Sequence, residues 1–211
     1  MDFKAARAKL IEHLGSEITD KRVLAAMSRI PREEFVPREY RHQAYEDRPL
    51  PIGWEQTISQ PYIIALMTGA LELNGSEKVL ELGTGSGYQA AILAELAGRV
   101  ITVERVSPLA ESARKVLDSL GYTNIEIHLA GETLGWKQSA PYDAIMVTAG
   151  APGIPDDLLS QLAIGGRMII PVGSRYIQEL CKVTKRQVKN QVEKLCGCRF
   201  VALIGKNAWE N

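Results

Sequence analysis

One stretch near the middle of the chain constrains the fold more than any other. Residues 79–88 read Val-Leu-Glu-Leu-Gly-Thr-Gly-Ser-Gly-Tyr, and residues 100–104 read Val-Ile-Thr-Val-Glu. The first run predicts a buried strand, a tight glycine turn and the start of a helix, and the second predicts the next strand, which ends in a carboxylate. This order indicates a nucleotide pocket at the carboxyl edge of a parallel sheet.

The spacing of the glycines narrows the class of ligand. Gly83, Gly85 and Gly87 follow the pattern G-x-G-x-G, and Tyr88 stands where a dinucleotide fingerprint has a further glycine, so the pattern disfavours a nicotinamide cofactor. With Glu81 two residues ahead of the first glycine, the run resembles the first motif of S-adenosylmethionine (AdoMet) methyltransferases. In that class, an acid at the position of Glu81 helps to hold the methionine end of the cofactor.

A second acid fits the same interpretation. Glu104 lies 21 residues after Gly83, where a carboxylate at the end of the second strand can accept hydrogen bonds from ribose hydroxyls. From the loop alone, two interpretations stay open. One is a pocket for a nucleoside cofactor, and the other is a glycine turn followed by an acid with no ligand.

Composition bounds the remaining choices. The chain has 211 residues with 45% hydrophobic content and a formal net charge of zero, which suits one globular domain with an appendage and gives no global field toward nucleic acid or membrane. The start of the chain lacks the apolar core of a signal peptide, and no apolar run is long enough to span a bilayer. The three cysteines, Cys181, Cys196 and Cys198, cannot all pair, which favours a reducing cytoplasm; their spacing is unlike that of zinc ligands.

The order of predicted elements favours an α/β fold. Two helices, capped by Asp2 and Asp20, open the chain, and the proline-rich residues 31–56 look irregular. From residue 59, helices and strands alternate, which indicates parallel strands joined by crossover helices. The predicted helices cover about 2–14, 20–30, 60–73, 87–96, 107–120 and 155–162, and the predicted strands about 78–82, 99–104, 126–129, 142–147 and 167–172, with a hairpin within 178–204.

We therefore expect a doubly wound, mostly parallel sheet of the Rossmann-like AdoMet-dependent methyltransferase type, with N-terminal helices and a C-terminal β-hairpin. Residues 1–58 would form the N-terminal helices and a segment that covers the substrate. Residues 59–211 would form the AdoMet-binding core, and both parts would make one compact unit.

A second motif points to the acceptor. Residues 57–61 read Thr-Ile-Ser-Gln-Pro and are preceded by Pro-Leu-Pro-Ile-Gly at 49–53; this combination resembles the signature of protein-L-isoaspartate O-methyltransferases, and other AdoMet enzymes do not share the first element. The resemblance covers nearly the whole chain from about residue 19. Its further segments are 30–37, 79–89, 142–152, 165–173 and 199–205.

The resemblance implies transfer of a methyl group from AdoMet to the α-carboxylate of L-isoaspartyl residues in damaged proteins, with a succinimide then leading back to aspartate. It implies that Ser59 is catalytic by positioning that carboxylate, and that isoaspartyl proteins and peptides are the partners. The implied substrate-binding residues are Ser59, Val201, Ala202 and Leu203. The implied cofactor-binding residues are Gln56, Thr57, Ile58, Glu81, Gly83, Thr84, Gly85, Ser86, Gly87, Glu104, Arg105, Gly131 and Glu132.

Ser59 has a second interpretation. A serine followed by Gln60 and Pro61, then by an apolar run, is a good helix N-cap with proline in the first turn. The two roles are compatible, because a helix start also favours an anionic group.

The expected reaction needs neither a general base nor a metal. A carboxylate is already ionised at neutral pH, and an oxyanion hole would hold this nucleophile back. The histidines His13, His42 and His128 all lie outside the motifs.

Three positions differ from the usual family pattern. Gly131 stands where an aspartate is normally set against the adenine edge, and Glu132 is the neighbouring acid; Glu132 either replaces that aspartate or is a solvated loop acid. Ala202 stands where proline is usual, which loosens the expected acceptor groove. Trp54 replaces a smaller residue and either covers the site or packs on the surface.

Two other functions compete with repair. One is an AdoMet enzyme that acts on RNA or a small molecule, supported by a basic C-terminal region. The other is a non-catalytic AdoMet-binding module. The sequence does not determine the oligomeric state, and we favour a monomer. The basic residues of the C-terminal region are Lys182, Lys185, Arg186, Lys189, Lys194 and Arg199.

Overall fold

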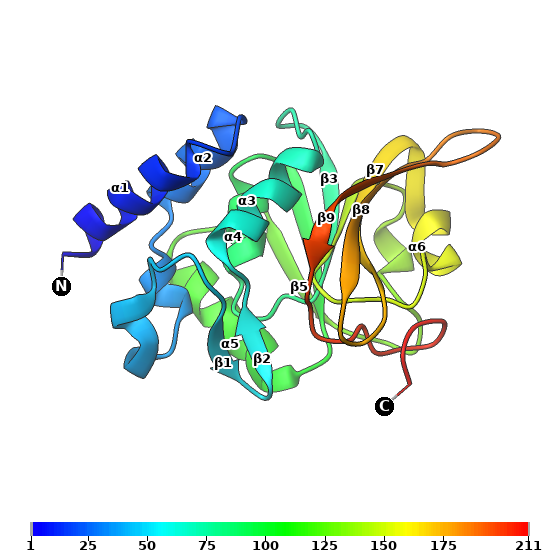
Figure 1. Cartoon of the computed structure of the whole chain (residues 1–211). Helices are drawn as coiled ribbons and strands as arrows, with labels where there is room; N and C mark the ends of the chain where they lie inside the picture. The colour runs from blue at the N-terminus through cyan, green and yellow to red at the C-terminus, as the bar shows by residue number, and fades with distance from the viewer. Residues whose placement is uncertain (1, 211) are drawn as a thin grey trace.

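A seven-stranded sheet forms the centre of the computed structural model, which describes residues 2–210 (Figure 1). The strand order is β5-β4-β3-β6-β7-β8-β9. Five neighbouring strands are parallel and the last two are antiparallel, which confirms the doubly wound, mostly parallel sheet with a C-terminal hairpin. The strands are β3 (Lys78–Leu82), β4 (Arg99–Glu104), β5 (Ile125–Leu129), β6 (Tyr142–Val147), β7 (Leu162–Gly173), β8 (Gln178–Thr184) and β9 (Gln191–Cys198).

Helices cover both faces of the sheet. Side chains alternate between the faces of a strand, so Val79 on β3 packs in one buried cluster with Met67 of α3 (Pro61–Ala70) and Leu93 of α4 (Tyr88–Ala94). Its neighbour Leu80 packs in the opposite cluster with Leu158 of α6 (Asp156–Gln161). The helix α5 (Ser107–Ser119) joins β4 to β5. These positions match the predicted helices to within a few residues.

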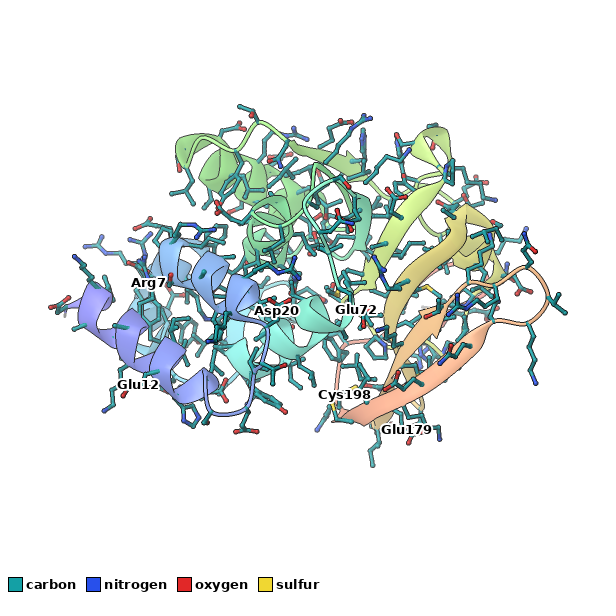
Figure 2. All side chains as sticks on the ribbon, turned by 90° about the horizontal axis from the view of Figure 1, so that it is seen from above. Arg7, Glu12, Asp20, Glu72, Glu179 and Cys198 are labelled. Atoms are coloured by element: carbon teal, nitrogen blue, oxygen red, sulfur yellow. The ribbon has the colours of Figure 1, made fainter. Side chains whose placement is uncertain are left out.

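The two N-terminal helices form as predicted. Asp2 accepts a hydrogen bond from the Ala5 amide at the start of α1 (Phe3–Leu14), and Asp20 accepts one from the Arg22 amide at the start of α2 (Lys21–Arg29). The buried residues of both helices join the cluster that contains α4 and α5. Figure 2 shows this helix pair, with Arg7, at the left end of the molecule, while the β8–β9 hairpin extends toward the right end. Within residues 2–210, no helix is long and apolar enough to cross a membrane.

The proline-rich segment contains more regular structure than we expected. It forms two short 3₁₀ helices, η1 (Arg32–Phe35) and η2 (Arg38–Gln43), and then a hairpin of β1 (Leu50–Gly53) and β2 (Gln56–Ile58). The turn of the hairpin is formed by Trp54 and Glu55, whose φ angles are 49° and 58°. Such turns usually carry glycine or asparagine, and their absence at these two positions explains why no hairpin was expected here. Trp54 is 56% exposed there. The division of the chain at residues 58 and 59 stays a prediction.

The expectation that Ser59 caps α3 is wrong. Pro61 is the first residue of the helix, so Gln60 takes the N-cap position, and its side chain makes no capping bond. The acceptor comes from Asp47 instead, which takes 2.8 Å hydrogen bonds from the Tyr62 amide and from Nε2 of Gln60. Capping by a distant carboxylate leaves the Ser59 hydroxyl free of this duty.

This arrangement predicts different effects on stability at the two positions. Asp47→Ala removes the acceptor at the start of α3 and should lower the free energy of unfolding by about 1–2 kcal/mol. Ser59→Ala should change it by less than about 0.5 kcal/mol. Urea denaturation followed by circular dichroism measures both, and an equal loss in the two variants would show that Ser59 caps the helix after all.

Candidate active site

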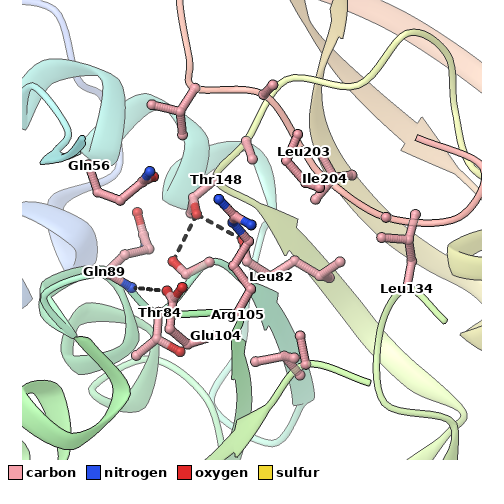
Figure 3. Close-up of a pocket in the computed structure, with 18 of the residues that line it drawn as sticks. Gln56, Leu82, Thr84, Gln89, Glu104, Arg105, Leu134, Thr148, Leu203 and Ile204 are labelled. Carbon is pink, nitrogen blue, oxygen red and sulfur yellow. Dashed lines mark hydrogen bonds between the residues drawn. The ribbon is translucent and has the colours of Figure 1, made fainter. Parts of the chain in front are cut away.

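A pocket opens where the carboxyl ends of β3, β4 and β6 meet. Strand β3 lies between β4 and β6, so the connections that leave β3 and β6 diverge at this point, where open α/β sheets bind their ligands. The pocket encloses about 1110 Å³, its open mouth included. Most of its wall comes from residues 56–59, 82–86, 103–105, 130–135 and 201–205 (Figure 3).

Nearly all the predicted site residues line this one pocket, although they come from distant parts of the chain. Glu81 and Gly87 are the exceptions, since neither belongs to the wall. The predicted residues in the wall are Gln56, Thr57, Ile58, Ser59, Gly83, Thr84, Gly85, Ser86, Glu104, Arg105, Gly131, Glu132, Val201, Ala202 and Leu203. Their assigned roles stay predictions.

The glycine loop needs its glycines for two different reasons. At Gly83, φ is +95° and an added Cβ would lie 2.3 Å from Oγ1 of Thr148, so only glycine fits against the end of β6. At Gly87, φ is +89° and an added Cβ would crowd Ala113 and Leu117 of α5. Gly87 therefore serves helix packing, which explains why it lies outside the pocket wall.

Thr148 is a site residue that sequence reasoning missed. Its hydroxyl lies 2.8 Å from the carbonyl oxygen of Leu82 and 2.9 Å from that of Gly83, and it ties the glycine loop to the end of β6 (Figure 3). Its position directly after a predicted strand could have indicated a site residue, because β6 is a parallel neighbour of β3. Gln89, the second residue of α4, also lines the pocket, and its Nε2 donates to the Thr68 hydroxyl at a distance of 3.0 Å.

Glu104 connects the loop to the next helix. One carboxylate oxygen accepts from the Gly85 amide at 2.8 Å, and the other accepts from the Val106 amide at 2.9 Å. A carboxylate has about four acceptor positions, so Glu104 keeps capacity for hydroxyl donors in the pocket. Its predicted contact with the ribose stays a prediction.

Glu81 lies beneath the pocket. It is fully buried, its Oε2 accepts from the Thr102 hydroxyl at 2.5 Å, and its Oε1 has no partner within residues 2–210. The Thr102 hydroxyl in turn lies 2.7 Å from that of Thr84 in the glycine loop. Burial raises the pKa of Glu81 to about 8, although the bond from Thr102 opposes the shift. Glu81 therefore reaches the pocket through two threonine hydroxyls.

Ser59 presents an uncommitted hydroxyl. The residue is half-buried in the pocket wall. Among residues 2–210, its Oγ takes part in no hydrogen bond, whereas its carbonyl oxygen does. Its carbonyl oxygen accepts from Nη2 of Arg32 at 3.0 Å.

Residues 201–205, which we call the C-terminal wall, present backbone groups to the pocket. The Val201 carbonyl accepts from the Gly150 amide at 2.7 Å, and the Leu203 amide donates to the Gly150 carbonyl at 2.8 Å. Because successive peptide groups of an extended chain point in opposite directions, the amide and carbonyl of Ala202 point away from Gly150. Neither has a partner among residues 2–210.

The loop at 130–135 is held at both ends. At its start, the Ala130 amide donates to the Glu104 carbonyl at 2.8 Å. The buried Gln161 accepts from the Trp136 amide and donates to the Leu134 carbonyl, each at 2.8 Å. His128 stacks on Trp136 with ring centres 4.0 Å apart. Residues 130–133 are exposed, and a Cβ on Gly131 would meet nothing within 4 Å, so neither conformation nor space demands glycine there.

The histidines and cysteines lie outside the pocket wall. Among residues 2–210, no cluster of three or more His, Cys, Asp or Glu side chains is arranged to hold a metal ion. The three cysteines are free. Burial raises the pKa of Cys181 and Cys196, and that of Cys198 to about 12, which disfavours reactive thiolates.

The buried carboxyl of Glu81 predicts a pH dependence of stability. Between its ordinary pKa of 4.5 and about 8, the folded state keeps a proton that the unfolded chain has released. Stability therefore falls as the pH rises through this window and is level above it. Glu81→Gln removes the titration, so the wild type should lose on the order of a few kcal/mol relative to the variant between about pH 5 and about pH 9. Urea unfolding of both proteins measures this, and parallel pH profiles would contradict the assignment.

The family profile and the sequence relatives that match this chain all belong to one family. The profile described as protein-L-isoaspartate(D-aspartate) O-methyltransferase matches residues 5–208. The chain is 54% identical to protein-L-isoaspartate O-methyltransferase of Geobacter metallireducens, over 99% of this chain and 98% of the relative. It is 58% identical to the Syntrophus aciditrophicus protein of that name, over 91% of this chain and 89% of the relative.

Solved structures agree with the sequence relatives. A protein-L-isoaspartate O-methyltransferase matches with a TM-score of 0.85 at 31% identity, over 96% of this chain and 67% of that one. A candidate enzyme of the same kind from Plasmodium falciparum, solved with S-adenosyl-L-homocysteine, matches with a TM-score of 0.83 at 27% identity, over 95% of this chain and 99% of that one. The profile match and the relatives more than half identical along the chain show that it belongs to the protein-L-isoaspartate(D-aspartate) O-methyltransferase family.

Proposed function

We propose that the chain is a repair enzyme that transfers a methyl group from AdoMet to the α-carboxylate of L-isoaspartyl residues in damaged proteins. The family resemblance seen in the sequence is confirmed by the profile match. The observation that carries the proposal is the pocket itself. It joins the glycine loop and Glu104 to the free hydroxyl of Ser59 and the unpaired backbone of Ala202.

The residues of the pocket fit AdoMet. The glycine loop brings backbone close to the ligand space without side chains at Gly83 and Gly85, and Glu104 retains acceptor positions for hydroxyl groups. When bound, AdoMet supplies a methyl group on a positively charged sulfur. The residues that would hold it are Gln56, Thr57, Ile58, Gly83, Thr84, Gly85, Ser86, Glu104, Arg105, Gly131 and Glu132. We propose that Glu81 and Gly87 support this site from behind, through Thr102 and α5 respectively.

The acceptor would be held by Ser59 and the C-terminal wall. Ser59 can donate one hydrogen bond to the isoaspartyl carboxylate, and Ala202 can donate and accept along the main chain of an extended peptide. The family commonly has proline at the position of Ala202, and proline has no amide hydrogen to donate. The neighbouring Val201 and Leu203 fix the direction of this edge through Gly150.

The protein supplies orientation and excludes water. An ionised carboxylate needs no base, and strong stabilisation of its charge would slow the attack. Holding two reactants in attack geometry can contribute about 7–11 kcal/mol. Ser59 therefore acts by aiming the carboxylate with one hydrogen bond.

RNA methylation is the less favoured function, because several basic side chains of the C-terminal region are engaged within the fold. Lys185 donates to the carbonyls of Leu159 and Leu162, and Lys182 pairs with Glu72. Lys194 pairs with Glu179. These contacts assign structural roles to part of the proposed RNA-binding surface.

Location and assembly stay predictions of this proposal. We expect a cytoplasmic protein, supported by its free cysteines, that acts on isoaspartyl proteins and peptides as a monomer. We expect no nucleic-acid or membrane partner.

The assignment of Glu132 to the adenine amino group is testable by binding. Glu132 lines the pocket from the exposed loop, so Glu132→Ala should weaken S-adenosylhomocysteine binding about tenfold in calorimetry, the size of one charge-assisted hydrogen bond. Glu193→Ala removes an exposed acid from β9 and serves as the control. Equal affinities in wild type and Glu132→Ala would make Glu132 a solvated loop acid.

The function is tested by methanol release from an isoaspartyl peptide and from its normal aspartyl twin. The wild type should methylate only the isoaspartyl peptide. Ser59→Ala should bind S-adenosylhomocysteine normally and lower kcat roughly ten- to a hundredfold, since one hydrogen bond to the acceptor is lost. Equal release from both peptides would refute the proposed function, and unchanged kcat would refute the role of Ser59.

A further inference from the structure

The side chain of Arg32 is completely buried between the two halves of the site. It belongs to η1, far from the pocket in sequence, and it has no exposed surface. Its Nε donates to the Ala44 carbonyl at 2.8 Å, and its Nη2 donates to the Ser59 carbonyl at 3.0 Å. Its Nη1 has no partner within residues 2–210. The guanidinium lies 5.0 Å from the centre of the Tyr88 ring.

This buried charge is costly. A buried cation with incomplete hydrogen bonding lowers stability unless other groups compensate it. Burial lowers the pKa of Arg32 to about 10, and the side chains that oppose this shift are Tyr88, Tyr45 and Asp47, so the group is charged at neutral pH. The nearest acid in sequence, Glu33, pairs with Arg7 and Tyr45 instead.

The contacts of Arg32 join the acceptor side of the pocket to the donor side. Ser59 carries the predicted acceptor contact, and Tyr88 is the first residue of the helix that follows the glycine loop. Phe35, from the same 3₁₀ helix as Arg32, packs edge-on against Tyr88 with ring centres 5.4 Å apart. One guanidinium thus lies against both segments that must be held at a fixed separation.

Ser59 is restrained through its backbone and through the residues that follow it. Arg32 holds its carbonyl, and Asp47 holds the next residue, Gln60, and the Tyr62 amide. These bonds restrict rotation about the Cα–C bond of Ser59 and so limit the directions that its Cα–Cβ bond can take.

We propose that Arg32 is a positioning residue, which sets the direction of the Ser59 hydroxyl by holding the Ser59 carbonyl while its own guanidinium is held over the Tyr88 ring. This inference rests on the proposed function, because it concerns the same acceptor contact. It differs from a purely structural role, in which Arg32 would affect the amount of folded protein and leave the turnover of each folded molecule unchanged.

A double-mutant cycle separates the two roles. Arg32→Met keeps an unbranched apolar stem and removes the guanidinium with all its donors. The substitution is measured in the wild type and in Ser59→Ala. The readouts are kcat and KM for the isoaspartyl peptide, the Kd for S-adenosylhomocysteine, and stability in urea. Arg29→Met is the control, because it removes an exposed arginine paired with Glu95.

If Arg32 acts through Ser59, Arg32→Met lowers kcat about tenfold in the wild type and less than about twofold in Ser59→Ala. Affinity for S-adenosylhomocysteine stays within about twofold, and Arg29→Met behaves as wild type. The same fold-loss in both backgrounds, or unchanged kcat per folded molecule, overturns the proposal.

Arg32→Lys carries the same cycle if Arg32→Met does not fold. Lysine keeps the buried charge, but its single ammonium lacks the planar fork that reaches both carbonyls. A loss of kcat on Arg32→Lys in the wild type that disappears in Ser59→Ala supports positioning, whereas the same loss in both backgrounds rejects it. Failure of the wild type to methylate the isoaspartyl peptide would overturn the proposed function and this inference together. Activity of the wild type with additive losses would overturn only the inference.

Discussion

The rest of the site depends on the parallel pairing of β3 with β4 and β6, which brings the carboxyl ends of these three strands together. The neighbours of β3 are β4 and β6, and the loops that leave these strands share one edge of the sheet. Gly83 turns there at a φ that other residues rarely adopt, with Thr148 too close for a Cβ. A backbone that approaches the pocket this closely gives a nucleoside cofactor a surface without side chains, and Glu104 holds the same loop from the next strand.

The part of the pocket that contains Ser59 depends on side chains of the N-terminal segment, which hold the backbone of Ser59 and the start of α3. Asp47 caps α3 and Arg32 holds the Ser59 carbonyl, so the structural duties at this helix start fall on groups outside the pocket. The Ser59 hydroxyl is thereby left available for the acceptor contact that we propose. Since the expected reaction needs orientation more than acid–base chemistry, a free and well-aimed hydroxyl is what the site has to provide.

The sequence predicted most of the sheet and the pocket because their signals are local. The apolar run of β3, the glycines and the acid that ends β4 lie within one short stretch, and the resemblance supplied Ser59 and residues 201–203. The long-range features were missed. Asp47 accepts from the amide of Tyr62, 15 residues later, at the start of α3. The β1–β2 turn uses Trp54 and Glu55 at positive φ. The Thr148 hydroxyl, at the end of β6, donates to the Leu82 carbonyl at the end of β3. Glu81 lies outside the pocket wall, fully buried and bonded to Thr102, and its predicted role at the cofactor stays a prediction.

We propose that this protein acts by geometry, with the Ser59 hydroxyl aimed at a carboxylate held beside the cofactor pocket. A crystal structure with S-adenosylhomocysteine and an isoaspartyl peptide tests it most directly. We expect the Ser59 Oγ within hydrogen-bond distance of the peptide α-carboxylate, and that carboxylate facing the sulfur. A carboxylate bound away from Ser59, or a Ser59 hydroxyl turned back to the amides of α3, would contradict the account.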